Sequence, residues 1–177
     1  MRIVSGVFKG RVLKSFDGDK VRPTSDMARE SLFNILRDRI AGAKFLDLFC
    51  GTGAMGIEAI SRGADFVVFN DYSRDSVSLT KQNLEKLGIR DRVKVHTLDA
   101  MVLLDSIGEC FDIVFMDPPY KSDVGEKALN LVAKVLNEGG IVILENEDGF
   151  DREILGLVKY DERKYGRARF TFFKKGA

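Results

Sequence analysis

KFLDLFCGTGAMG, at residues 44–56, joins an apolar run of strand length to a glycine-rich turn and the start of a helix. This order is typical of nucleotide-binding folds, because glycine lets the backbone approach a ligand closely and the helix end offers free N–H groups. Gly51, Gly53 and Gly56 also satisfy the G-x-G-x-x-G pattern, and Asp71 follows Gly51 by 20 residues. Taken alone, the stretch predicts a dinucleotide-dependent oxidoreductase.

The chain after residue 43 alternates apolar runs with amphipathic stretches. Such alternation is typical of βα units, which build a largely parallel sheet with helices between the strands. We expect strands at residues 44–49, 66–71, 92–96, 111–117 and 140–145, with helices near 54–62, 73–87, 100–108 and 123–136. Two final strands are predicted near 155–161 and 167–174, joined by a turn at Tyr165-Gly166.

The residues ahead of this core predict a helix and a small hairpin. Ser25 is a candidate N-cap for a helix that runs to about residue 40. Alternating apolar residues within 2–15 predict a short hairpin around Lys9-Gly10. Because the chain has no repeat and no long linker, we expect a single domain over residues 1–177, made of a basic hairpin extension (1–24) and an α/β, Rossmann-like core (25–177).

Composition narrows the class of protein. Apolar residues make up 45% of the 177 residues and charged residues 31%, which is typical of a folded, water-soluble chain. The longest apolar runs are strand-sized, far short of the roughly 20 residues that span a membrane, and no apolar leader follows Met1. Cys50 and Cys110 are too few for a disulfide framework, and His96 is the only histidine. We therefore predict reduced thiols, no zinc or other metal site, no membrane contact and a cytoplasmic location.

Positive charge is concentrated at the two ends of the chain. Residues 1–22 carry a net charge of +4 and residues 163–177 carry +6, which leaves −9 on the middle of a chain whose net charge is +1. A polyanionic partner such as a nucleic acid would therefore meet the termini. Ordinary solvated chain ends are the alternative interpretation of the same pattern.

Acidic residues near the ends of the first three strands favour a cationic ligand over a pyrophosphate. Asp47 lies four residues before Gly51, where its carboxylate would repel a pyrophosphate but attract the ammonium and sulfonium of S-adenosylmethionine. Asp71 ends the second strand and can accept hydrogen bonds from both hydroxyls of a ribose. Asp99 follows the third strand, where it can hold an adenine amino group. The structural alternatives are a cap of the glycine turn for Asp47 and helix N-caps for the other two.

Asp117-Pro118-Pro119-Tyr120 follows another predicted strand, at the edge where α/β folds place their chemistry. The prolines fix the backbone, and their carbonyls have no neighbouring N–H, so the Asp117 carboxylate and the Pro118 carbonyl are free acceptors. Two acceptors can draw an exocyclic amine of a base toward tetrahedral geometry, which frees its lone pair for methylation. Tyr120 can stack on a base that has left its helix. A loop that merely ends the strand is the alternative.

These motifs resemble those of a known group. The glycine stretch, the three aspartates and Asp117–Tyr120 resemble the successive motifs of class I methyltransferases that act on amino groups. Residues 22–36 (RPTSDMARESLFNIL) and 2–13 (RIVSGVFKGRVL) are similar to the N-terminal signature of the bacterial 16S ribosomal RNA guanine-N2 methyltransferase family. The resemblance covers nearly the whole chain. It implies a seven-stranded mixed sheet with the last strand antiparallel and helices on both faces.

The resemblance also assigns roles by position. It implies that S-adenosylmethionine is the cofactor and that the amine of a guanine is held by Asp117, Pro118, Pro119 and Tyr120. The implied cofactor site consists of Asp47, Phe49, Gly51, Gly53, Asp71, Asp99, Ala100, Arg22 and Thr24. Within it, the methionyl end would lie at Asp47 and the glycines, the ribose at Asp71 and the adenine at Asp99. Many members have an apolar residue before the ribose-binding acid, whereas this chain has Asn70.

The implied partner is 16S ribosomal RNA, within the small subunit or one of its assembly intermediates. The basic chain ends agree with this partner, because lysine and arginine bind phosphates. The candidate RNA contacts are Lys9, Arg11, Lys14, Arg22, Lys164, Arg167 and Arg169. Since the chain has no room for a separate recognition domain, we expect selectivity to depend on the shape of an assembled particle. We also expect a monomer.

Other functions remain open. Asp-Pro-Pro-Tyr also resembles the motif of DNA adenine-N6 and cytosine-N4 methyltransferases, which usually carry extra sequence that reads a site, and of glutamine methyltransferases, which tend to have asparagine first. A nicotinamide-dependent oxidoreductase would use the glycines and Asp71 but leave Asp117–Tyr120 without a role. A binding protein that has lost catalysis would not need every one of these positions filled.

Overall fold

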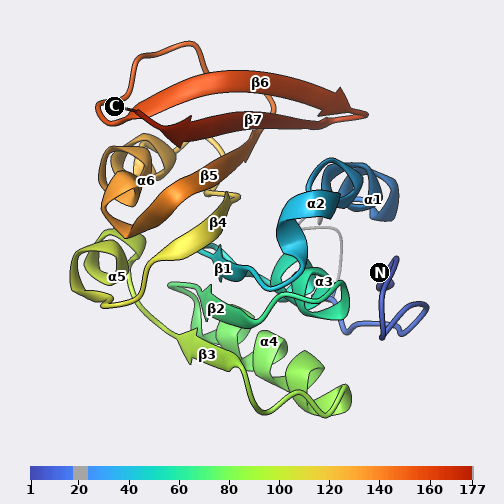
Figure 1. Ribbon diagram of the computed structural model, residues 1–177. Helices are drawn as coiled ribbons and strands as arrows, with labels where there is room; N and C mark the ends of the chain where they lie inside the picture. The colour runs from blue at the N-terminus through green and yellow to red at the C-terminus, as the bar shows by residue number, and fades with distance from the viewer. Residues whose placement is uncertain (18–23, 177) are drawn as a thin grey trace.

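The computed structural model describes residues 1–17 and 24–176. Its centre is one seven-stranded sheet made of β1 (Lys44–Asp47), β2 (Phe66–Asn70), β3 (Val93–His96), β4 (Phe111–Met116), β5 (Leu136–Asn146), β6 (Leu157–Tyr165) and β7 (Ala168–Lys175). Across the sheet the order is β3-β2-β1-β4-β5-β7-β6 (Figure 1). β1 to β5 pair in parallel, whereas β7 is antiparallel to both neighbours. The predicted mixed sheet with an antiparallel last strand is confirmed.

Helices cover both faces of the sheet, as predicted (Figure 1). One face carries α1 (Asp26–Ile35), α2 (Arg37–Ile40), α3 (Ala54–Ser61) and α4 (Arg74–Lys86). The other carries α5 (Ala100–Ser106) and α6 (Val124–Val132), and a short 3-10 helix, Ala133–Val135, follows α6. Within the described part of the chain, no helix is long and apolar enough to cross a membrane.

Neighbouring residues of each central strand pack against different helices, because side chains alternate between the faces of a strand. In β4, Ile113 and Phe115 join the core on the α1–α4 side, while Val114 and Met116 join the core beneath α5 and α6. Burial on both faces explains why the parallel strands are continuous apolar runs in the sequence. The same alternation turns Asp47 toward the α1–α4 side, where its carboxylate meets α3.

The helix predicted over 25–40 is two helices. Ser25 caps the first one as expected, its hydroxyl accepting the Ala28 N–H at 3.1 Å. The chain leaves regular helical geometry at Leu36 (φ −81°, ψ 0°), and α2 follows directly. Leu36 and Ile40 are each 1% exposed, so the turn keeps the chain packed on the core up to the start of β1.

The region between α6 and β5 also differs from the expectation. The helix predicted over 123–136 ends at Val132, and β5 begins at Leu136 rather than at 140. The register between β4 and β5 shifts between Phe111 and Ile113. Glycine makes this irregularity possible, because a Cβ on Gly140 would lie 2.8 Å from a backbone oxygen of the same strand.

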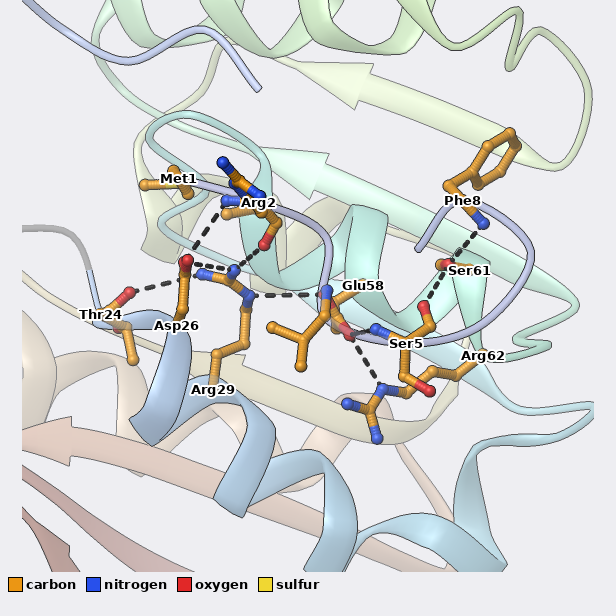
Figure 2. Close-up of polar contacts among 12 residues, drawn as sticks. Met1, Arg2, Ser5, Phe8, Thr24, Asp26, Arg29, Glu58, Ser61 and Arg62 are labelled. Carbon is orange, nitrogen blue, oxygen red and sulfur yellow. Dashed lines mark hydrogen bonds and ion pairs between the residues drawn. The ribbon is translucent and has the colours of Figure 1, made fainter. Parts of the chain in front are cut away.

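The short hairpin predicted within residues 2–15 is present: Arg2 and Val12 form an antiparallel bridge, and backbone hydrogen bonds join residues 1–3 to residues 10–13 at 2.8 to 3.1 Å. In the turn of this hairpin, backbone N–H groups between residues 4 and 8 bond to Glu58 and Ser61 of α3, at 2.9 to 3.0 Å (Figure 2). A buried carboxylate requires such donors, so the turn of the hairpin packs on α3.

Candidate active site

The glycine-rich turn after β1 is held from two directions. The Gly51 N–H donates to the Asp71 carboxylate at 2.9 Å, and the Thr80 hydroxyl of α4 donates to the Gly51 carbonyl at 2.9 Å. Gly53 is the N-cap of α3 with φ of +84°, and a Cβ there would lie 2.9 Å from the Thr80 methyl carbon. Glycine is therefore required at this position both by the backbone conformation and by the space available.

Asp47 lies beneath this turn with one oxygen unpaired. Its side chain is 1% exposed, and Oδ2 accepts the Gly56 N–H at 3.0 Å. Oδ1 is buried and has no hydrogen-bond partner among the described residues. Burial raises the pKa of Asp47 to about 7; the Gly56 N–H opposes this rise and the negative charge of Asp71 adds to it. Capping of the turn thus accounts for one oxygen only, and the other suits a cationic ligand.

A cavity at the carboxyl ends of β1 and β4 brings together much of the predicted site. Its wall includes five predicted residues, which are Thr24, Asp47, Phe49, Gly51 and Asp117. The N-terminal segment contributes two further wall residues that sequence reasoning missed, Met1 and Phe16. Two acids from neighbouring strands therefore border one hollow, beside the glycine turn.

Asn70, the polar residue directly before the candidate ribose-binding Asp71, has a structural role. Its side-chain amide donates to the carbonyls of Leu48 and Leu98 at 3.3 and 3.0 Å, and it accepts the Leu98 N–H at 3.2 Å. Because Asn70 is 1% exposed, these bonds tie together the ends of the first three strands inside the core. These hydrogen bonds hold the end of β2 in place, and the next residue, Asp71, lies beside the glycine turn.

Asp71, Asp99 and Ala100 lie at the ends of β2 and β3 and are not part of the cavity wall formed by the described residues. Asp71 accepts the Ser73 N–H at 2.9 Å in addition to Gly51, while Ser73 itself is the N-cap of α4. Asp99 is the N-cap of α5, using Oδ1 alone. Its Oδ2 accepts no hydrogen bond from the described residues. Ala100 is 4% exposed in the core beneath α5.

Asp117 stands at the mouth of the cavity, open to solvent on its outer side. Protein packed around the carboxyl group raises its pKa well above the ordinary value, and the nearby carboxylates of Glu145 and Asp47 raise it further. The Pro118 ring packs on α6, where a Cβ on Gly125 would come within 2.7 Å of Pro118 Cγ. The packing of Pro118 on α6 thus fixes the position of the loop that follows β4.

The two proline carbonyls of this loop differ in their hydrogen bonds. The Pro118 carbonyl accepts no hydrogen bond from the part of the chain that the structure describes. The Pro119 carbonyl accepts the Ser122 hydroxyl at 2.8 Å. Tyr120 is 63% exposed, and the Lys121 ammonium lies 5.4 Å from the centre of its ring. An exposed ring three residues after Asp117 is available for stacking.

A second carboxylate beside Asp117 was missed by sequence reasoning. Glu145 lies near the end of β5, and its Oε2 accepts the Thr24 hydroxyl at 2.6 Å. Burial raises the pKa of Glu145, and the Thr24 hydroxyl partly opposes this rise. The available signal was an acid directly after the apolar run of a predicted central strand, the same pattern that identified Asp117.

Buried charges attach the N-terminal segment to α1 and α3 (Figure 2). Glu58 is 0% exposed and Arg29 is 1% exposed, with Arg29 Nε 3.5 Å from the Glu58 carboxylate. Arg29 also donates to the carbonyls of Arg2 and Thr24. The network thereby fixes the segment that carries Met1, and it fixes Thr24, so both stay in the cavity wall. Its sequence signal was Glu58, the one charged residue of α3.

The candidate RNA contacts are not equivalent. Arg22 lies outside the described residues. Lys14 donates to the Gln82 side chain and Arg11 to a backbone carbonyl, both on α4, so their partners are neutral. Arg169 instead pairs with Glu162 at 2.7 Å. No acid pairs with the other described candidates, which are Lys9, Lys164 and Arg167.

Known proteins resemble this chain over almost its whole length. The family described as Conserved hypothetical protein 95 matches residues 1–174. Ribosomal RNA small subunit methyltransferase D of Escherichia coli (strain K12) is 37% identical, and the match covers 100% of this chain and 91% of that protein. The chain belongs to the small-subunit ribosomal RNA methyltransferase D family.

Further similarities agree with membership of the methyltransferase D family. The protein of the same name from Buchnera aphidicola subsp. Acyrthosiphon pisum is 33% identical over 82% of this chain and 77% of its own length. The solved structure of yhhF from Escherichia coli has a TM-score of 0.87 at 29% identity, covering 100% of this chain and 98% of that chain. Together they identify the sheet as the Rossmann-like fold of class I methyltransferases, which favours methyl transfer over the oxidoreductase interpretation of the glycines.

Proposed function

We propose that this chain transfers the methyl group of S-adenosylmethionine to the exocyclic N2 amine of a guanine in 16S ribosomal RNA of the small subunit. One observation carries the proposal: the unpaired buried oxygen of Asp47 and the carboxylate of Asp117 border the same cavity. The first suits a cationic cofactor, and the second suits an amine that becomes cationic as it is methylated. Membership of the methyltransferase D family supports the reaction, and the names of its relatives support the RNA.

S-adenosylmethionine fits the residues around the glycine turn. Its methyl group is bonded to a sulfonium, which makes the methyl reactive toward a weak nucleophile. Asp47 Oδ1, which has no hydrogen-bond partner among the described residues, would accept a hydrogen bond from the methionyl ammonium. Gly51 and Gly53 would let the backbone approach the same end of the cofactor, with Phe49 and Thr24 completing the wall.

The rest of the cofactor would follow the ends of the next strands. Asp71 is the candidate partner of the ribose hydroxyls, since it already lies against the glycine turn. Asp99 keeps Oδ2 for the adenine amino group while Oδ1 caps α5, so the structural and the functional interpretations of this residue are compatible. Ala100 and Arg22 remain proposed contacts.

The target amine would be held by Asp117 and the Pro118 carbonyl. Their two acceptors take the N–H groups, which draws the nitrogen toward tetrahedral geometry and favours the positive charge of the transition state. Tyr120 would stack on the extruded guanine. The main source of rate acceleration would be the alignment of nitrogen, methyl carbon and sulfur, and Pro119 would contribute by fixing the loop.

RNA would reach this cavity along the N-terminal segment. Lys9, Arg11 and Lys14 lie on the segment whose other residues, Met1 and Phe16, form part of the cavity wall. Their charges are not offset by acids among the described residues, so they are available to phosphates. Lys164, Arg167 and Arg169 would bind the opposite side, with Arg169 contributing less because of its pairing with Glu162.

The test is methylation with tritiated S-adenosylmethionine and three acceptors: small subunits lacking native methylation, free 16S RNA and duplex DNA. We expect label in N2-methylguanosine from the subunits, and its loss in the Asp117→Ala variant. S-adenosylhomocysteine binding, measured by calorimetry, should persist in that variant and serves as its folding control. Label in a DNA adenine or cytosine, or in protein glutamine, would overturn the proposed substrate.

A further inference from the structure

Asp117 and Glu145 form a pair of neighbouring acceptors at the ends of β4 and β5. Met116 pairs with Leu144 in the sheet, so the next residue of each strand lies beside the other. Met116 and Leu144 both pack beneath α5 and α6, and the alternation of side chains therefore sends the two carboxylates to the opposite side. Thr24 meets Glu145 on that side.

One oxygen of Glu145 is left for a ligand. Thr24 occupies Oε2 at 2.6 Å, and this bond restricts the glutamate to one orientation. Oε1 accepts no hydrogen bond from the described residues, and the Glu145 side chain is only partly buried. An oriented carboxylate beside Asp117, with one oxygen not bonded to the described residues, is an acceptor ready for a second donor.

Two neighbouring carboxylates disfavour each other's charge. Burial is the first cause of the raised pKa of Asp117, and the charge of Glu145 raises this pKa further. A ligand that places hydrogen-bond donors against both relieves this repulsion, whereas a ligand that presents a lone pair increases it. The pair therefore selects for two adjacent donors. Asp47, the acid with an unpaired oxygen that lines the cavity together with Asp117, would be occupied separately by the proposed cofactor.

We propose that Glu145 accepts the N1–H of the target guanine while Asp117 holds the neighbouring N2 amine. This inference rests on the proposed function, and it adds the residue that selects the base. Guanine presents N1–H and the N2 amine side by side, so both carboxylates find donors. Adenine and cytosine place an unprotonated ring nitrogen next to their amino groups, and a carboxylate repels that lone pair. Glu145 would thus exclude the two bases that other Asp-Pro-Pro-Tyr enzymes methylate.

The test uses the Glu145→Gln variant and two target bases. Glutamine keeps an oxygen for the Thr24 hydroxyl but offers an amide N–H where the glutamate offers an acceptor. Small subunits are reconstituted with guanine or with 2-aminopurine at the nucleotide labelled by the wild-type enzyme. The analogue keeps the amine but lacks N1–H. Glu147→Gln, an exposed acid two residues further along, is the matched control.

We expect the wild type to prefer guanine over 2-aminopurine in kcat/KM by ~10- to 100-fold, the effect of one hydrogen bond to a charged group. Glu145→Gln should reduce or reverse this preference, because its amide can donate to the unprotonated N1. Glu147→Gln should keep the wild-type ratio, and all three proteins should bind S-adenosylhomocysteine equally.

Two negative results are distinguishable. If Glu145→Gln lowers kcat/KM for both bases by the same factor, or not at all, Glu145 does not read the base and this inference is overturned while the proposed function stands. If the wild type places no label in guanine, the proposed function itself fails and the inference fails with it.

Discussion

The unpaired buried oxygen of Asp47 lowers the stability of the ligand-free protein when the carboxylate is charged. Burial raises its pKa from 3.8 to about 7, so the native state binds this proton more tightly than the unfolded state. The contribution to stability is complete below the unfolded value and is lost as the pH rises through about 7. At pH 8 the folded chain therefore holds an unpaired carboxylate, and the cofactor would supply its missing partner.

The Asp47→Asn variant removes this charge and keeps an oxygen for the Gly56 N–H. We expect the ligand-free wild type to lose stability relative to the variant between pH 5 and pH 8, by on the order of 3 kcal/mol. Urea unfolding at the two pH values measures the difference. A constant offset between the two proteins would show that Asp47 does not carry the unpaired charge.

Cofactor affinity should rise with pH as Asp47 loses its proton, whereas the stability of the ligand-free protein falls. Protonated Asp47 offers no charge to an ammonium, so S-adenosylhomocysteine should bind roughly tenfold more weakly at pH 6 than at pH 8. Asp47→Asn should bind weakly at both values, with little dependence on pH. Calorimetry at pH 6, 7 and 8 checks this, and an equal pH dependence in both proteins would contradict it.

Among the elements, α6 sets the position of the catalytic loop through contact of Gly125 with Pro118. Gly125→Ala should favour helix formation by up to about 1 kcal/mol, yet its Cβ would push the proline ring away. We expect kcat to fall, by up to ~100-fold, without loss of stability or of S-adenosylhomocysteine affinity. Thermal unfolding and single-turnover methylation measure the two effects. Alanine at the exposed Gly108, where no atom lies within reach of a Cβ, is the control.

Elements and site residues could be predicted from the sequence where the signal is local. The glycine turn, Ser25 as an N-cap and the acids that end strands are examples, because each depends on a few neighbouring residues. Contacts between distant parts of the chain could not be predicted in this way: the turn of the N-terminal hairpin packs on α3 through Glu58, 54 residues from Val4. Glu145 was missed because its partner Thr24 is 121 residues away and only the sheet register brings it beside Asp117.

At the scale of the whole molecule, the basic residues of the N-terminal segment have no acidic partners among the described residues, whereas Arg169 near the other end of the chain pairs with Glu162. We therefore expect the N-terminal segment to bind RNA more strongly. Replacing Lys9, Arg11 and Lys14 together with alanine should raise KM for small subunits and lower the slope of log affinity against log salt by about 2 to 3. The control replaces Lys127 and Lys134, which already pair with acids. Filter binding at several salt concentrations gives the slopes, and equal slopes for both variants would contradict the proposed path of the RNA.

The place of β7 in the sheet has a consequence for protein synthesis. This strand is made last among the seven, yet it lies between β5 and β6 and buries Phe170, Phe172 and Phe173. Until it emerges during translation, β5 keeps an open edge at the strand that carries Glu145, which is opposite Phe170 in the finished sheet. A nascent chain whose β7 has not yet emerged therefore exposes an unpaired sheet edge and the apolar surface that these phenylalanines later cover, which is the kind of surface that invites aggregation.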